Sequence, residues 1–333
     1  MLPLRVMVAG DKEDPVQELP NAAMVATEWE LDSGSVATWR YSANFLYRLT
    51  INGVPHFLRV APAGDRPLER LEREVLLMDW LQSEGWCVPV AVPARRAARI
   101  ATARAGGQEY HAVLWSEVPG KLRELDELSL DDLEAWGAAL GRLHVALRRV
   151  PPARGPARIA WHAERDLILL AMPSWPAEIQ SIAADSLEWI ASLPTRGDDY
   201  GLIHGDFELD NLPWGDDGPC VIDFDEAGMS WATADIAFAV RDLVEEGEDV
   251  SSPRLAAFCR GYATERPLPA RLGEDLPRFN QWARLATLAR IDHARSTDER
   301  GFPDWAQTLN RRLDELAATY RASILANAPS LGA

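Results

Sequence analysis

Hydrophobic positions in the first third of the chain follow a strand pattern and then a helix pattern. From residue 45 to residue 51 every second position is hydrophobic, Asn52-Gly53 follows, and residues 56–60 return to an extended pattern. Alternation on both sides of an Asn-Gly pair predicts a β-hairpin with a type I′ turn. Pro67 then opens a segment with apolar side chains three and four residues apart, which predicts a helix to about Ser83, ended by Gly85.

A second part with mainly helical periodicity follows. Residues 110–115 predict one more strand, and Pro119-Gly120 interrupts the pattern. Ser129 and Asp132 form a capping box before a helix with one leucine-rich face, on which Gly137 and Gly141 predict the close approach of another element. Residues 163–193 and 253–325 are also helical in pattern, and residues 202–225 read as two short strands.

These patterns predict an α+β protein with two lobes. Residues 1–113 form a small lobe with an antiparallel sheet and one main helix, residues 114–120 form a hinge, and residues 121–333 form a larger, mostly helical lobe. A chain of 333 residues is long for a single hydrophobic core, which favours the same division.

The net charge of the chain limits the kinds of molecule that it is expected to bind. The chain carries 34 basic and 51 acidic side chains, a formal charge of -17. Binding to nucleic acid depends on Lys and Arg that neutralise phosphates, so this charge argues against a nucleic-acid partner. A cationic small substrate fits the sign of the charge better.

Cysteine usage and hydropathy indicate a cytoplasmic protein. Cys87, Cys220 and Cys259 are few and far apart, so we expect neither a disulfide framework nor a zinc site. Acidic residues from Asp11 onward come too early for a signal peptide. No apolar run approaches the roughly 18 residues that a membrane span needs, so no membrane association is expected.

The most informative stretch is residues 202–211, Leu-Ile-His-Gly-Asp-Phe-Glu-Leu-Asp-Asn, with Val-Ile-Asp-Phe-Asp at 221–225. Phosphoryl transfer from a Mg-nucleotide uses one carboxylate to orient the attacking hydroxyl, and an amide oxygen and a second carboxylate to hold the metal. Asp206, Asn211 and Asp223 have that order and approximate spacing. We expect Cys220 to Ile222 to form a short buried strand that fixes Asp223 at its end.

With these motifs in place, the chain resembles the aminoglycoside phosphotransferase and choline kinase superfamily, which has a protein-kinase-like fold. The resemblance covers roughly residues 35 to 240 and is carried by His204-Gly-Asp-x-x-x-x-Asn211, Ile222-Asp-Phe-Asp225 and Asp235-Ile-Ala. It implies that Asp206 is the catalytic base, that Asn211 and Asp223 bind Mg²⁺, and that His204 and Asp235 support the catalytic loop.

The resemblance also implies a nucleotide site. Arg59 takes the position of the strand cation that contacts the α- and β-phosphates, and Glu74 that of its helix partner. Backbone groups of Ser116 and Val118 are expected at the adenine. The loop over the phosphates, with Ser42 and Asn44, contains no glycine, and Arg replaces Lys at position 59, which changes the geometry of that cation.

The predicted activity is transfer of the γ-phosphate of ATP, or of GTP, to a hydroxyl of a small molecule such as an aminoglycoside, an amino alcohol or a sugar. Candidate substrate contacts are Glu208, Asp225, Glu226 and Trp231. For the acids, assistance to the metal or local hydrogen bonding is an equal alternative. Two other functions stay open: a protein serine/threonine kinase, against which the short interval from Asp223 to Asp235 argues, and a catalytically silent nucleotide-binding module.

Overall fold

The computed structural model describes residues 1–13, 19–156, 158–216 and 218–327. The chain forms two compact units. Unit 1 consists of Met1–Val75, Pro89–Glu117 and Arg290–Thr319, and unit 2 of Leu76–Val88, Val118–Ala289 and Tyr320–Ala333. The lobe and hinge boundaries given above stay predictions.

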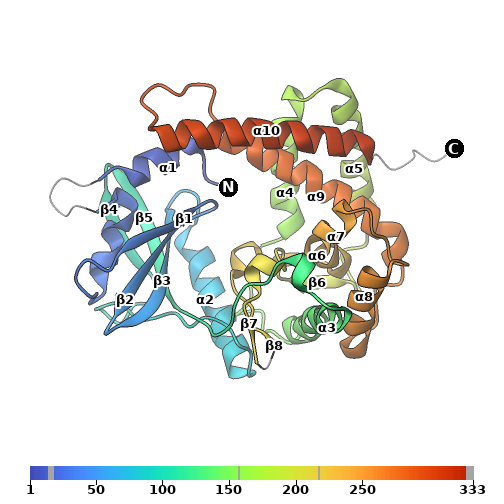
Figure 1. The fold of residues 1–333 in the computed structure, drawn as a ribbon, viewed down its shortest axis with the longest axis horizontal. Coiled ribbons are helices and arrows are strands. Elements are labelled where there is room, and N and C mark those ends of the chain that lie inside the picture. Colours follow the sequence, from blue (N-terminus) through green and yellow to red (C-terminus); the bar gives the residue numbers. More distant parts are fainter. Residues whose placement is uncertain (14–18, 157, 217, 328–333) are drawn as a thin grey trace. The chain divides into compact units, whose positions relative to one another are not determined.

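Unit 1 is built on a five-stranded antiparallel sheet with strand order β1-β2-β3-β5-β4 (Figure 1). The strands are β1 (Ala37–Tyr41), β2 (Phe45–Ile51), β3 (Val54–Pro62), β4 (Ala101–Ala105) and β5 (Gln108–Ser116). The predicted hairpin is confirmed as β2 and β3, joined by Asn52 and Gly53 with φ of 52° and 76°. Positive φ at both turn residues is what a type I′ turn requires.

Alternation in β2 buries one face of the sheet. Phe45, Tyr47 and Leu49 are at most 1% exposed. Two elements that the sequence did not indicate, the helix α1 (Leu4–Asp11) and the 3-10 helix η1 (Asn21–Glu28), belong to the same unit. A Cβ on Gly10 of α1 would come within 2.3 Å of the Phe45 ring, so a glycine is needed where α1 meets β2.

The helix predicted to follow Pro67 is α2 (Leu68–Ser83), and Gly85 after it has a φ of 86°. Left-handed backbone is favourable for glycine, and it stops a helix at this position. The first half of α2 lies in unit 1 and the second half in unit 2.

Unit 2 is largely helical. Its helices are α3 (Leu130–Leu147), α4 (Ala160–Ala171), α5 (Ala177–Ser192), α6 (Ala232–Ala239), α7 (Arg241–Glu245) and α8 (Pro253–Glu265), and it shares α9 (Leu272–Ala294) and α10 (Asp304–Ala326) with unit 1. Among the described residues, no helix combines the length and the apolar character that crossing a bilayer requires.

Helix α3 begins with the predicted capping box, in which Ser129 and Asp132 exchange hydrogen bonds. The predicted close approach is made by α8: a Cβ on Gly137 would lie 1.9 Å from the carbonyl oxygen of Phe258. The backbones of α3 and α8 therefore pack directly against each other in unit 2.

Residues 202–225 differ from expectation in one respect. Strand β6 (Tyr200–Ile203) pairs with β9 (Gly228–Trp231), and β7 (Trp214–Gly215) with β8 (Gly218–Pro219), but residues 220–222 are not a strand. Their N–H groups donate to two different segments: Cys220 and Ile222 to the carbonyls of Pro213 and Asn211, and Val221 to the carbonyl of Cys87. Cys220 and Val221 are buried as predicted and Ile222 is half-buried, but the hydrogen bonds of the segment do not form a ladder with one partner strand.

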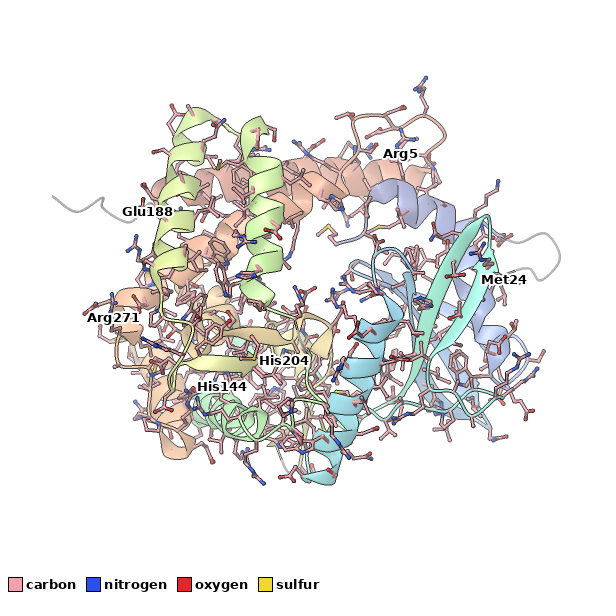
Figure 2. The ribbon with its side chains drawn as sticks, turned by 180° about the vertical axis from the view of Figure 1, so that it is seen from behind. Arg5, Met24, His144, Glu188, His204 and Arg271 are labelled. Atoms are coloured by element: carbon pink, nitrogen blue, oxygen red, sulfur yellow. A yellow bond between two sulfur atoms is a disulfide. The ribbon has the colours of Figure 1, made fainter. Side chains whose placement is uncertain are left out.

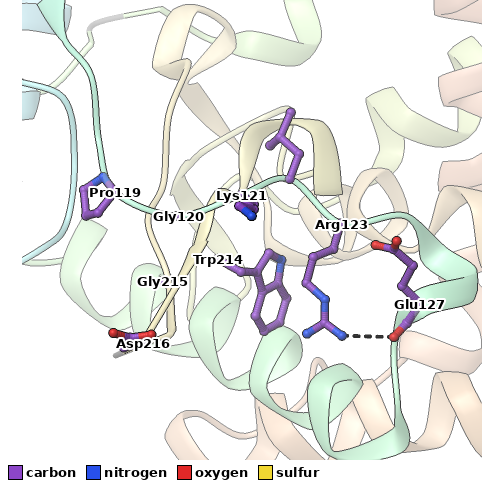
Figure 3. A pocket seen from close by; sticks show the side chains of 9 residues that line it. Pro119, Gly120, Lys121, Arg123, Glu127, Trp214, Gly215 and Asp216 are labelled. Atoms are coloured by element: carbon purple, nitrogen blue, oxygen red, sulfur yellow. Dashed lines mark hydrogen bonds between the residues drawn. The ribbon is translucent and has the colours of Figure 1, made fainter. Parts of the chain in front are cut away.

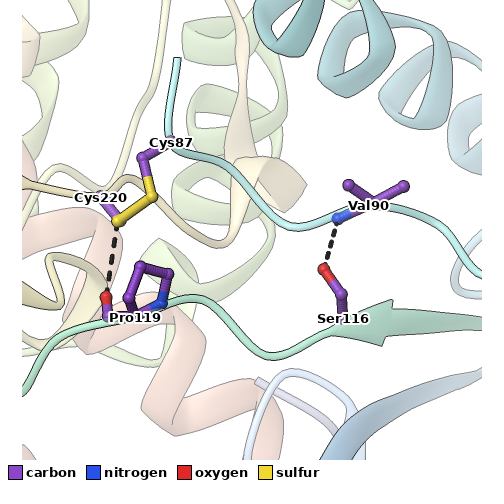
Figure 4. Close-up of a disulfide and its surroundings, with 5 residues drawn as sticks. All are labelled: Cys87, Val90, Ser116, Pro119 and Cys220. Atoms are coloured by element: carbon purple, nitrogen blue, oxygen red, sulfur yellow. Dashed lines mark hydrogen bonds between the residues drawn. A yellow bond between two sulfur atoms is a disulfide. The ribbon is translucent and has the colours of Figure 1, made fainter. Parts of the chain in front are cut away.

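The cysteine pattern predicted no disulfide framework, and the structure corrects this with one disulfide. Cys87 and Cys220 are joined by an S–S bond of 2.06 Å, 133 residues apart in sequence (Figure 4). The N–H of Val221 donates to the carbonyl of Cys87, so main-chain pairing brings the two segments together. Cys259 is the free cysteine and is buried. Sequence spacing could not show this pair because the fold, not the local chain, makes the cysteines neighbours.

Candidate active site

Asp206 and Asn211 lie together after β6, in a loop that ends in the 3-10 turn η4 (Leu209–Asn211). The Asn211 amide donates to the carbonyl of Asp206 and to its carboxylate, each at 2.9 Å. Because both partners are acceptors, the contacting atom must be the side-chain nitrogen Nδ2. The side-chain oxygen Oδ1 of Asn211 is therefore available as a ligand. The Asp206 carboxylate is held in place by the same contact.

Asp223 is brought beside this loop by main-chain pairing. The N–H of Ile222 donates to the carbonyl of Asn211 at 3.1 Å. Asp223 itself has φ of 61° and ψ of 66°, a left-handed conformation that Asp tolerates better than most residues. The three residues singled out from the sequence are therefore connected through one short set of backbone and side-chain hydrogen bonds in unit 2.

A buried network around Asp235 supports this loop from the protein interior. The carboxylate of Asp235 accepts from the N–H of His204 at 2.9 Å and the N–H of Gly205 at 2.7 Å, and it contacts the His144 ring at 2.9 Å. His144 also contacts the hydroxyl of Tyr262 at 2.8 Å. Figure 2 labels His144 and His204, the two histidines of this network. Burial acts to raise the pKa of Asp235, but the hydrogen bonds to His144 and His204 lower it below its usual range.

His204 connects the catalytic loop to the Asp223 segment. Its Nδ1 accepts from the N–H of Asp206, so its Nε2 carries the proton and donates to the carbonyl of Ile222 at 3.0 Å. Burial lowers the pKa of His204, and the ring is fully enclosed. The ring therefore bridges the two segments, and the supporting role of His204 stays a prediction.

Gly205 is needed for the close approach of two loops. Its φ is 83°, and a Cβ there would lie 2.7 Å from the carbonyl oxygen of Glu226. A side chain at this position would push the loop with Asp206 away from the segment after Asp223.

Glu208 points away from η4 toward α7. Its carboxylate pairs with Arg241 at 2.8 Å, a partner that the sequence did not indicate. Burial, and then the negative charge of the adjacent Asp206, raise the pKa of Glu208, against the lowering effect of Arg241. Glu208 therefore joins Asp206 to the charged residues of α7.

The other candidate substrate residues are placed differently. Glu226 pairs with Arg158 at 2.7 Å, and Asp225 is 6% exposed. Trp231 is 4% exposed, donates to the carbonyl of Pro194 and packs against Trp161. Trp231 thus packs in the aromatic core of unit 2, and this burial argues against a contact with the substrate.

The predicted phosphate-binding pair lies in unit 1. Arg59 of β3 and Glu74 of α2 form a buried ion pair, and the guanidinium lies 5.7 Å from the Trp115 ring centre. The two side chains are 9% and 5% exposed. The burial and the ion pair hold both side chains in a fixed position. Arg59 is therefore not a freely solvated surface cation.

The other predicted nucleotide residues lie in loops or at the end of a strand. Ser42 donates its N–H to the carbonyl of Asn44 in the turn from β1 to β2. Ser116, at the end of β5, accepts the N–H of Val90 on its hydroxyl at 2.9 Å. Val118 begins the next segment of unit 2 and is half-buried.

The donor set in unit 2 fits Mg²⁺. Asp223 offers a carboxylate, and Asn211 offers an amide oxygen whose orientation is fixed by Asp206. Mg²⁺ prefers oxygen ligands and is usually held by one or two carboxylates together with phosphates and waters. Among the described residues no group of three or more His, Cys, Asp or Glu could hold a metal alone, so phosphate oxygens would have to complete the shell.

A separate hollow lies beside β7 (Figure 3). It has a volume of about 610 Å³ and is lined by the segment Pro119–Arg123, Glu127, Trp214, Gly215 and Asp216. The guanidinium of Arg123 lies over the Trp214 ring at 5.3 Å and donates to the carbonyl of Glu127. Trp214 is half-buried and lines this hollow.

Known proteins resemble this chain over most of its length. The amicoumacin kinase of Bacillus subtilis (strain 168) is 21% identical over 238 residues, 68% of this chain and 70% of that protein. An uncharacterized protein of Synechocystis sp. is 24% identical, over 77% of this chain and 74% of that one.

Solved structures share the fold. A structure of amicoumacin kinase with AMP-PNP and Ca²⁺ aligns with a TM-score of 0.75 at 18% identity, over 92% of both chains. A microcompartment-associated aminopropanol kinase aligns with a TM-score of 0.64 at 25% identity, over 91% of this chain and 98% of that chain. The model of the Phosphotransferase enzyme family matches residues 40–273, well over half of the sequence. The chain therefore belongs to the Phosphotransferase enzyme family and has its kinase-like fold, as the resemblance in the sequence predicted.

Proposed function

We propose that this protein transfers the γ-phosphate of ATP to a hydroxyl group of a small molecule. The observation that carries the proposal is the hydrogen-bonded set of Asp206, Asn211 and the Ile222–Asp223 segment. A carboxylate fixed beside two oxygen ligands is the arrangement that phosphoryl transfer needs, because the reaction depends mainly on positioning and charge neutralisation.

Each of the three residues has one role. Asp206 accepts a hydrogen bond from the acceptor hydroxyl, orients its oxygen toward the γ-phosphorus and takes its proton late in the transfer. Asn211 and Asp223 would hold Mg²⁺, which neutralises the phosphate oxygens when it is bound with the nucleotide. His204 and Asp235 keep the loop in place and do not touch the reacting groups.

In unit 1, Arg59 is the residue that we assign to the α- and β-phosphates, with Glu74 orienting it. Ser42 and Asn44 are assigned to the phosphate loop, and the backbones of Ser116 and Val118 to the adenine. The support for these roles is the buried Arg59–Glu74 pair and the family to which the chain belongs.

The relatives guide the choice of acceptor and nucleotide. The names of similar proteins refer to amicoumacin and aminopropanol, and one structure contains kanamycin with GDP. All three compounds are small molecules with hydroxyl groups. We therefore propose a small hydroxyl compound as acceptor and ATP as donor, with GTP as the alternative donor.

The test is a screen of hydroxyl-bearing metabolites and antibiotics, monitored by ADP release with ATP and by GDP release with GTP. We expect at least one acceptor to raise nucleotide turnover well above the rate without acceptor, and the phosphorylated product to appear by mass spectrometry. Release that is independent of every acceptor, together with phosphate found on added protein substrates, would contradict the proposal.

A further inference from the structure

Arg284 of α9 is a buried cation without a direct partner. Its side chain lies in unit 2 and the residue is 5% exposed. Among the described residues its Nε finds no hydrogen-bond acceptor, and no carboxylate forms an ion pair with the guanidinium. Glu245 and the hydroxyl of Tyr320 act on it only electrostatically, and burial lowers the pKa of Arg284.

Asn280 lies one helical turn before Arg284 and is unsatisfied in the same way. It is 3% exposed, and neither its Oδ1 nor its Nδ2 has a hydrogen-bond partner in the part of the chain that the structure describes. Residues four apart on a helix are neighbours on one face. Buried polar groups normally find partners, and a buried charge without one is especially unfavourable. Two such residues side by side therefore indicate a missing ligand.

A series of charged and polar residues leads from this pair to the catalytic carboxylate. Glu208 lies beside Asp206 and pairs with Arg241 at 2.8 Å. Tyr320 of α10 lies within electrostatic range of Arg241, Glu245 and Glu208. Helices α9 and α10 are in contact through the hydrogen bond from the Gln281 amide to the carbonyl of Ile324. All of these residues belong to unit 2, so the series does not depend on the placement of unit 1.

From this arrangement we infer that Arg284 and Asn280 form an acceptor subsite that binds a carboxylate carried by the hydroxyl substrate. The inference rests on the proposed function, since it concerns the acceptor of that reaction. A guanidinium binds a carboxylate through paired N–H donors, and the Asn280 amide can both donate to and accept from a neighbouring amine or hydroxyl. Glu245, and Glu208 beyond Tyr320, favour a single negative charge over a doubly charged phosphate ester.

The test uses acceptors in pairs that differ only by a carboxylate: L-homoserine with 3-amino-1-propanol, and L-serine with ethanolamine. ADP release is measured for the full-length protein and for Arg284→Met, Arg284→Lys and Arg278→Met. Arg278 lies on the same helix, stacked on Trp189, and serves as the matched control. Met fills a volume close to that of Arg, so the substitution leaves no large cavity.

We expect the carboxylate-bearing member of a pair to be the better acceptor. Arg284→Met should raise its KM by about 30-fold or more, because one partner of a buried charge pair is lost. In Arg284→Met the KM for ATP should stay at the wild-type value and the thermal midpoint should not fall. Arg284→Lys should recover part of the affinity for the carboxylate-bearing acceptor, and Arg278→Met should behave as wild type.

Several results would overturn the subsite. One is preference for the member without a carboxylate; another is an unchanged KM in Arg284→Met with a raised thermal midpoint, which indicates a bound water only. Binding is also measured without turnover, by calorimetry with AMP-PNP present, and no difference between wild type and Arg284→Met for any carboxylate compound rejects the subsite. Absence of ADP release from every acceptor, with carboxylate binding that depends on Arg284, would instead reject the phosphotransferase proposal and keep the site.

Discussion

The side-chain amide of Asn211 donates to the carboxylate of Asp206 at 2.9 Å. One hydrogen bond therefore fixes two groups that phosphoryl transfer uses differently. In the proposed mechanism it holds the carboxylate that would meet the acceptor hydroxyl, and it leaves the side-chain oxygen of Asn211 on the side away from that carboxylate, where it could bind a cation. The pairing explains why an Asn, with both a donor and an acceptor, stands at this position.

Asp223 gives a prediction about the metal. Asp223→Asn keeps a residue that tolerates the left-handed backbone but removes the negative charge. The Mg²⁺ concentration for half-maximal ADP release should rise by about tenfold or more, since loss of even outer contacts to a bound metal weakens affinity that much. Asp210→Asn, at an exposed position of the same region, is the control and should follow the wild-type curve. Equal Mg²⁺ dependence for all three proteins would remove Asp223 from the metal site.

Asp132 gives a prediction about pH. Hydrogen bonds from Arg123 and then from Ser129 lower the pKa of Asp132 below its ordinary value near 4. Folding therefore gains stability from the ionised carboxylate above pH 4, and that gain is lost as the pH falls toward the lower pKa of the folded state. Asp132→Asn should reduce the free energy of unfolding by about 1 to 2 kcal/mol at pH 7 and by much less near pH 2.

Urea unfolding of both proteins across this range measures the difference. The exposed neighbour Asp131→Asn is the matched control. A deficit in Asp132→Asn that is the same size at every pH would show that the ion pair and capping box do not depend on the charge.

The disulfide between Cys87 and Cys220 should stabilise unit 2. It closes a loop of 133 residues, and removal of a native disulfide typically costs about 2 to 5 kcal/mol. Cys87→Ser should lower the urea midpoint under non-reducing conditions, and addition of a dithiol should bring the wild type down to the same midpoint. Thiol titration of the unfolded, unreduced wild type should find Cys259 alone. Three free thiols, or a wild type insensitive to the dithiol, would contradict the pairing.

Gly137 tests the contact between α3 and α8. A Cβ there would lie 1.9 Å from the carbonyl of Phe258, a backbone atom that cannot move aside alone. Gly137→Ala should lower the free energy of unfolding by about 2 kcal/mol or more despite the better helix propensity of Ala. At Gly64 a Cβ meets no atom within 4 Å, so Gly64→Ala is the control. A stabilised Gly137→Ala protein would show that the helices are farther apart than the structure has them.

The parts of the fold that could be predicted from sequence are those with local causes. Asn52-Gly53 can form only a few turn types, and the Ser129 capping box satisfies its own helix end. The order of Asp206, Asn211 and Asp223 was informative because a short loop must bring them together. The family and the fold followed from that motif.

The rest depends on contacts between distant segments. Cys87 and Cys220 become neighbours only through main-chain pairing at Val221, and the segment before Asp223 is buried without joining a sheet. Arg241 on helix α7 meets Glu208 in the loop before η4, and no spacing rule connects them. Trp231 is near Asp223 in sequence, yet the fold places it in an aromatic core.

The central claim is tested most directly by transfer of labelled γ-phosphate from ATP to an acceptor found in the screen, in wild type and Asp206→Asn. Asn has nearly the same size as Asp and can still form hydrogen bonds, but its amide cannot take the proton from the hydroxyl. We predict that turnover falls by about 10²- to 10⁴-fold while the affinity for AMP-PNP stays within about twofold of wild type. Wild-type transfer by Asp206→Asn would contradict the assignment of Asp206 and, with it, the proposed mechanism.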